Sequence, residues 1–66
     1  MNNLRTKRQS LGLSQTKLAI MVGVSNSVLS EIELDKRAPW PRLRKALAQA
    51  LGCRESDVFP EGQNHD

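Results

Sequence analysis

The chain has very few of the residues on which catalytic and metal sites depend. Its 66 residues include one cysteine, Cys53, one histidine, His65, and no tyrosine. A lone cysteine excludes an intramolecular disulfide and a cysteine-based zinc site, and its usual role is that of a small buried hydrophobe. No phosphate-binding loop, metal-ligand cluster or carboxylate pair accompanies these residues. The sequence therefore argues against an enzyme and predicts neither a cofactor nor a metal.

Long apolar runs are also missing. A helix that spans a membrane needs about 20 mainly apolar residues, and the chain has no such stretch and no recognisable signal peptide. A chain of this size forms a single domain that buries only about 60% of the surface its unfolded form exposes. We therefore expect a cytoplasmic protein whose function lies on its surface, with no membrane contact.

Negative charge is absent from the first 30 residues, although the whole chain carries seven acidic and ten basic side chains. This segregation gives a basic region and an acidic end, which suits a polyanionic partner. Charge alone leaves nucleic acid, anionic lipid and an acidic protein as alternatives. The basic residues of the first part are Arg5, Lys7, Arg8 and Lys17, and the acidic residues near the end are Glu55, Asp57, Glu61 and Asp66.

Apolar spacing and helix-capping residues predict an all-α fold of about five short helices, without strands. In the first helix, Leu4 and Leu11 share a face with Arg8 between them, and Gly12 ends the helix. Because Arg8 then lies on the inward face, it needs a partner. The second helix begins after Ser14 as N-cap and ends at Gly23.

The second half of the chain continues this pattern. Ser25 is the N-cap of a third helix that runs through Glu33. Two prolines then interrupt the helical pattern, and Pro41 fits the first turn of a fourth helix, which Gly52 ends. A short fifth helix is expected over residues 55–59. The buried stripe of the fourth helix is expected to contain Leu43, Ala46, Leu47, Ala50 and Leu51.

The glycine between the second and third helices has a geometrical purpose. A tight turn at Gly23 sets two short helices across each other, as in a helix-turn-helix unit. Such a pair suits the major groove of DNA, which is about 12 Å wide and accepts one helix with a second helix as its support. The outward side chains of the third helix can hydrogen-bond to base edges, although any surface helix is polar on its outer side. These residues are Asn26, Ser27, Ser30 and Glu31.

The segment LRTKRQSLGLSQTKLAIMVGVSNSVLSEIELDKRAPWPRLRKALAQALG resembles the Cro/C1 (XRE-type) helix-turn-helix family of phage-repressor-like proteins. Its LGLSQ, GVS, IE, KR and ALG elements follow the family's order and spacing, and the resemblance covers residues 3–59. It implies a compact five-helix, lambda-repressor-like DNA-binding domain over residues 1–60, with the helix-turn-helix at about 14–33 and a flexible polar tail at 61–66. The implied function is non-catalytic, sequence-specific transcription regulation, typically repression, in the cytoplasm or nucleoid of a bacterium or in a phage-infected cell.

The resemblance also assigns roles to particular residues. It implies that Arg8 and Glu33 form a structural ion pair. Glu31 departs from the family, which usually has a neutral or basic residue there, so it either contacts a base or pairs with an arginine or a helix neighbour of this protein. Base contacts are expected from Asn26, Ser27, Ser30 and Glu31, and contacts with the DNA backbone from Gln15, Lys17, Ser25, Lys36 and Arg37.

Partners other than DNA are also suggested. The family often forms dimers through its last helices, so we expect a weak homodimer on a pseudo-palindromic operator, although Val58 and Phe59 in this region could equally be core residues. Ile20 and Met21 occupy positions that are commonly polar, and Trp40 either covers the edge of the core or joins a subunit contact. If these three side chains are exposed, an antitoxin-like module that binds a protein partner is a second, lesser possibility.

Overall fold

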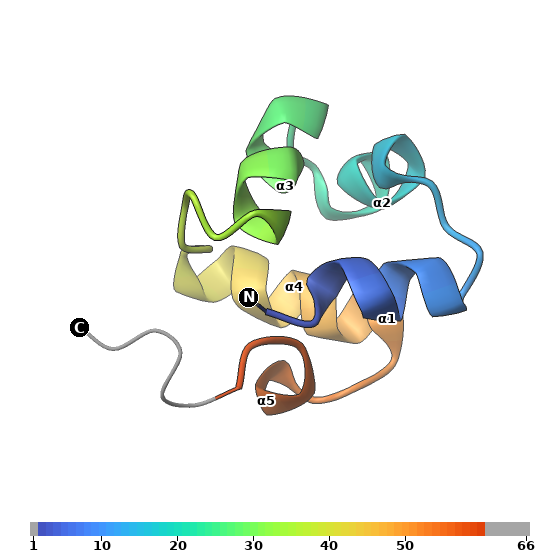
Figure 1. The fold of residues 1–66 in the computed structure, drawn as a ribbon, viewed down its shortest axis with the longest axis vertical. Coiled ribbons are helices and arrows are strands. Elements are labelled where there is room, and N and C mark those ends of the chain that lie inside the picture. Colours follow the sequence, from blue (N-terminus) through green and yellow to red (C-terminus); the bar gives the residue numbers. More distant parts are fainter. Residues whose placement is uncertain (1, 61–66) are drawn as a thin grey trace.

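The computed structural model describes residues 2–60, which form five α-helices and no strand. The predicted all-α, five-helix fold is therefore confirmed. Helices α1 and α4 cross the middle of the molecule in Figure 1, with α2 and α3 on one side of them and α5 on the other. The predicted tail at 61–66 lies outside the described residues. The helices are α1 (Leu4–Ser10), α2 (Gln15–Val22), α3 (Asn26–Glu33), α4 (Pro41–Leu51) and α5 (Glu55–Val58).

Two serines start α2 and α3, as the sequence predicts. The Ser14 side chain accepts a hydrogen bond from the backbone N–H of Lys17 at 3.0 Å, and Ser25 accepts one from Val28 at 3.2 Å. Each bond satisfies a backbone donor that the first helical turn leaves without a partner. The starts of the two helices are therefore fixed by local side chains rather than by distant contacts.

The short helix α5 is capped from within. The Asp57 carboxylate accepts the backbone N–H of Arg54 at 3.0 Å, and this hydrogen bond lowers the pKa of Asp57 below its usual value. The helix ends at Val58, one residue earlier than predicted, because Phe59 has left helical geometry with φ −123° and ψ 83°. Phe59 nevertheless remains in the core, where it is 4% exposed.

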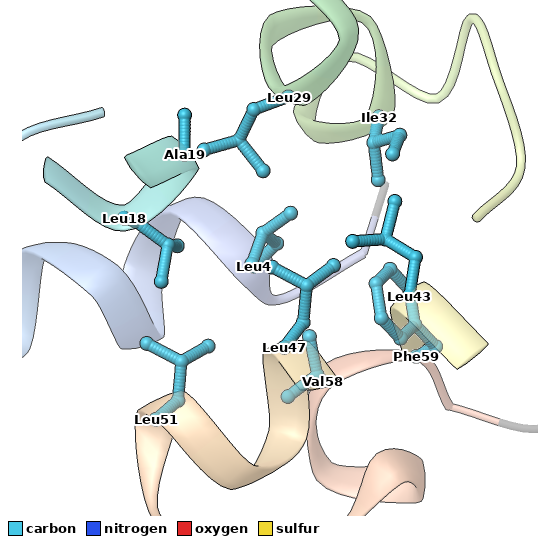
Figure 2. Close-up of a cluster of buried hydrophobic side chains, with 10 residues drawn as sticks. All are labelled: Leu4, Leu18, Ala19, Leu29, Ile32, Leu43, Leu47, Leu51, Val58 and Phe59. Atoms are coloured by element: carbon cyan, nitrogen blue, oxygen red, sulfur yellow. The ribbon is translucent and has the colours of Figure 1, made fainter. Parts of the chain in front are cut away.

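One core joins all five helices (Figure 2). Burial of a Leu, Ile or Val side chain stabilises the fold by about 1.5–3 kcal/mol relative to exposure. Cys53 is partly buried against this core, in keeping with the role of a small hydrophobe. The core consists of Leu4, Leu18, Ala19, Leu29, Ile32, Leu43, Leu47, Leu51, Val58 and Phe59.

Leu11 differs from the prediction. Leu4 is fully buried, but Leu11 is 54% exposed, so the two residues do not share a buried face. Helix α1 ends at Ser10, and the turn that follows bonds Gly12 to the Gln9 carbonyl at 3.0 Å. Leu11 thus lies past the last helical residue, where the period of 3.6 residues no longer sets the direction of its side chain.

Candidate nucleic-acid interface

The turn between α2 and α3 is closed by the backbone itself. Gly23 has φ +78°, the left-handed conformation that glycine adopts without steric cost. The N–H of Val24 bonds to the Ala19 carbonyl at 3.0 Å, and that of Gly23 to the Ile20 carbonyl at 3.3 Å. These two bonds form a Schellman motif, which ends α2 and sends the chain directly into α3.

Helix α3 has one apolar face and one polar face. Leu29 and Ile32 on the inner side are fully buried in the core. On the other side, Asn26 and Ser27 are exposed, and Ser30 is partly exposed. Figure 1 shows α3 at the edge of the molecule, beside α2 and away from α5. The core therefore fixes which polar side chains α3 presents outward.

The candidate base-contacting residues line one surface hollow together with a residue of α2. This hollow has a volume of about 410 Å³ and includes Gln15 from the first turn of α2. Amide, hydroxyl and carboxylate groups thus meet at one open site, which offers both hydrogen-bond donors and acceptors. Its lining residues are Gln15, Asn26, Ser27, Ser30 and Glu31.

A buried ion pair holds α3 from behind. The Nε of Arg8 lies 2.6 Å from Oε2 of Glu33, and the two side chains are only 10% and 4% exposed. Arg8 also donates to the Leu13 carbonyl at 2.9 Å, and Gln15 donates to Oε1 of Glu33 at 3.2 Å. We call these four residues the brace. It joins α1, the following turn, α2 and the last residue of α3, so Gln15 connects the brace to the hollow.

A second ion pair lies on the opposite side of the same helix. The Nε of Arg37 donates to Oε1 of Glu31 at 2.7 Å, and the side chains are 48% and 44% exposed. Sequence reasoning left three partners open for Glu31, and in this structure its partner is an arginine of the chain. Arg37 and Glu31 therefore form one surface unit beside the hollow.

The end of α3 places Arg37 next to this helix. The N–H of Lys36 bonds to the Glu31 carbonyl at 2.8 Å, and the N–H of Asp35 to the Ile32 carbonyl at 3.1 Å. These bonds form another Schellman motif, with Asp35 at φ +60° in the position usually taken by glycine. The turn folds the chain back over the last turn of α3, so residue 37 lies beside residue 31.

Asn2 supports this turn, a role that sequence reasoning missed. Its side-chain amide donates to the Ile32 carbonyl at 2.8 Å and to the Asp35 carboxylate at 2.9 Å, while its oxygen accepts the N–H of Leu4 at 2.9 Å. Asn2 is 8% exposed. An asparagine just before a helix signals a cap, but nothing in its local sequence indicates a partner about 30 positions away.

The surroundings of the hollow favour an anion. Neither α2 nor α3 has an acidic residue in its first turn, so the partial positive charge at each N-terminus is not offset locally. Lys17 in the first turn of α2, Ser25 at the N-cap of α3 and Lys36 just after the end of α3 are all exposed. No described part of the chain holds three or more residues that could bind a metal ion together.

The two residues named for the expected dimer contact lie in the core. Val58 is fully buried and Phe59 is 4% exposed, so both are core residues. Large exposed apolar side chains occur elsewhere among residues 2–60. They are Leu11, Ile20, Met21, Leu34 and Trp40, of which Ile20 is the most exposed at 75% and Trp40 is 45% exposed.

Comparison with known proteins agrees with this geometry. A family model described as helix-turn-helix matches residues 4–58, which is most of the chain. A search of curated proteins gave no significant match. None of the helices in the described part has the length and apolar character that a bilayer crossing requires.

Proposed function

We propose that the chain reads a specific DNA operator in the major groove with α3. The premise is that the chain belongs to the Cro/C1-type helix-turn-helix family and is a DNA-binding transcription regulator. One observation carries the proposal. The polar face of α3 opens onto a hollow that also contains the first residue of α2, while the opposite face is fixed in the core. Such a helix is exposed where it would meet base edges and supported where it would not.

The side chains of the hollow suit base readout. An asparagine amide pairs with the N7 and N6 atoms of adenine, so Asn26 is the first candidate for a bidentate contact. Ser27 and Ser30 add hydroxyls that both donate and accept. Glu31 adds a carboxylate that can accept a hydrogen bond from an exocyclic amine. Together these groups would discriminate bases through hydrogen bonds rather than through charge.

Contacts with the DNA backbone would hold this helix in position. We assign them to the N-termini of α2 and α3, where helix dipoles favour phosphate, and to the exposed cationic side chains nearby. Gln15 would serve a phosphate while it also donates to Glu33 at 3.2 Å in the brace. The proposed backbone contacts are Gln15, Lys17, Ser25, Lys36 and Arg37.

Repression and assembly belong to the same proposal. A weak dimer through the C-terminal region would place two copies of α3 about 34 Å apart on a pseudo-palindromic operator. Because Val58 and Phe59 are buried, the contact would use the outer side chains of that region. Bound in this way in the cytoplasm of a bacterium, the protein would repress by occupying its operator, without catalysis.

A protein partner is the second candidate, on the evidence of Ile20 and Met21. These α2 side chains are 75% and 52% exposed. Burial of such apolar side chains would stabilise the fold, so their exposure is consistent with a surface that a partner covers. An antitoxin-like role would use this surface, and Trp40 as a further contact. It predicts that Ile20→Ser with Met21→Ser abolishes capture of a protein partner while DNA binding remains.

Selection of bound sequences from a random duplex library tests the main proposal. We expect enrichment of one motif, repeated with inverted symmetry at a spacing of about one helical turn. The Asn26→Ala variant provides the control, since it should enrich a motif that is relaxed at one position of each half-site. Failure of the wild-type protein to enrich any motif would contradict specific recognition.

A further inference from the structure

The exposed pair of Glu31 and Arg37 has an unusual combination of place and charge. A carboxylate next to a polyanion is repelled by it, yet Glu31 lines the hollow where DNA would lie. Its Oε1 accepts the Nε–H of Arg37 at 2.7 Å, so the pair as a whole carries no net charge. The structure thus keeps an acceptor at the reading face while it removes most of the electrostatic cost.

The geometry of Arg37 is set by the fold and not only by attraction to Glu31. The Schellman motif joins the N–H of Lys36 to the carbonyl of Glu31 itself at 2.8 Å. Asn2 then fixes the Asp35 side chain and the Ile32 carbonyl from the protein interior. Because the turn is held on both sides, the backbone keeps residue 37 within hydrogen-bonding reach of the Glu31 carboxylate.

The acceptor that this pair presents matches one base better than the others. In the major groove only adenine and cytosine offer an exocyclic N–H donor. Adenine places its N7 acceptor next to that donor, and this lone pair would repel a carboxylate. Guanine and thymine present acceptors at the corresponding position. A carboxylate therefore selects cytosine.

From these observations we propose that Glu31 selects a cytosine in each half-site, and that Arg37 is the positioning residue that holds its carboxylate for this contact. The inference rests on the proposed function, since it names one base that α3 reads. It adds to the assignment of Arg37 to the DNA backbone, because a phosphate contact by itself would raise affinity equally for every sequence. Arg37 still has guanidinium N–H donors beyond Nε with which to approach a phosphate or a neighbouring base.

The test measures one ratio in several variants. The motif is first obtained by selection with the wild-type protein, and affinities are then measured for duplexes with cytosine or thymine at each C·G position. We expect the wild-type protein to prefer cytosine about tenfold at one position per half-site. Glu31→Gln should abolish this preference, because its amide donates as readily as it accepts. Arg37→Gln should reduce the preference at the same position, and the double variant should show no more loss than Glu31→Gln alone.

Two controls separate positioning from charge. Arg54→Gln removes the same charge from a side chain that is 83% exposed at the N-cap of α5, a helix on the far side of α1 and α4 from α3 (Figure 1), and should leave the ratio unchanged. Arg37→Lys keeps the charge but lacks the Nε donor, so it should weaken binding to random duplexes less than Arg37→Gln does, while it still loses part of the cytosine preference. All variants are expected to have the thermal unfolding midpoint of the wild-type protein, because the side chains of Glu31 and Arg37 are nearly half exposed and that of Arg54 is 83% exposed.

The outcomes are distinct. An undiminished cytosine preference in Arg37→Gln, or losses from Glu31→Gln and Arg37→Gln that multiply in the double variant, overturns the positioning role. If no position of the wild-type motif shows a preference for cytosine that Glu31→Gln abolishes, the base assignment is wrong. If the wild-type protein binds no duplex at all, the proposed function itself is wrong, and this inference with it.

Discussion

Helix α3 carries two ion pairs only two residues apart, and they differ in almost everything except chemistry. Glu33 pairs with Arg8 at 2.6 Å in side chains that are 4% and 10% exposed. Glu31 pairs with Arg37 at 2.7 Å in side chains that are 44% and 48% exposed. Similar distances thus occur in environments of very different polarity.

The difference shows what burial does to a charge pair. In a surface pair water screens both charges, and such a pair contributes only about 0–1 kcal/mol to stability. A buried charge that loses its partner is left without either water or a counter-ion, which costs about 3–5 kcal/mol. Glu33 therefore contributes to the stability of the fold, whereas Glu31 is exposed enough to contact a ligand while it is paired with Arg37.

The largest effect expected from this comparison follows loss of the buried carboxylate. Glu33→Ala should lower the free energy of unfolding by about 3–5 kcal/mol, because it leaves Arg8 buried without its counter-ion. Glu31→Ala is the matched control on the same helix and should change stability by less than about 1 kcal/mol. Urea denaturation followed by circular dichroism measures both, and equal losses would mean that burial does not distinguish the pairs.

The next largest effect concerns binding rather than stability. Asn26→Ala should weaken binding to the selected operator by about 1–3 kcal/mol and leave binding to random duplex nearly unchanged. Its side chain is exposed on the first turn of α3, so the fold should not suffer. Fluorescence anisotropy with both duplexes checks this, and parallel losses on the two would exclude Asn26 from base readout.

The turn that joins the two helices is expected to give an intermediate effect. Gly23→Ala should lower the free energy of unfolding by about 1 kcal/mol, since a non-glycine residue at φ +78° is strained. No heavy atom beyond its chain neighbours lies within 4 Å of the added Cβ, so backbone strain is the only direct cost. Thermal unfolding measures the change, and a neutral result would show that the turn relaxes without penalty.

The smallest effect should come from a single peripheral charge. Lys36→Ala should weaken binding to every duplex and reduce the slope of log K against log salt by about one unit. Affinity measured across a salt series gives this slope. An unchanged slope would remove Lys36 from the proposed phosphate contacts, without bearing on the brace.

Much of the fold could be predicted because its signals are local. Ser14 and Ser25 as caps, Gly23 as a stop and Pro41 in a first turn each act within a few residues, and each lies where the sequence placed it. The prediction for Leu11 is wrong because helix α1 ends at Ser10, so helical spacing no longer sets the direction of the Leu11 side chain. Local rules therefore succeed where a capping or stop residue marks the end of a helix, and fail where apolar spacing is carried past that end.

The arrangement around the site was harder to predict for the same physical reason. The pairing of Glu31 with Arg37 depends on a left-handed turn at Asp35. The sequence marks a left-handed helix end clearly when the residue is glycine, but not when it is aspartate. The contacts of Asn2 join the first residues of the chain to the end of α3. Such contacts follow from the assembled fold and leave no periodic trace in the sequence.

The central claim is that α3 meets DNA with the face opposite its brace, and amide chemical shifts recorded during a duplex titration test this most directly. We expect the largest shifts at the hollow, at Gln15, Asn26 and Ser30, and at Lys36 beside it. The amides of Arg54, the N-cap of α5, and of Ser56 within α5 should barely move. Shifts concentrated on α5, with those of α3 unchanged, would contradict the account.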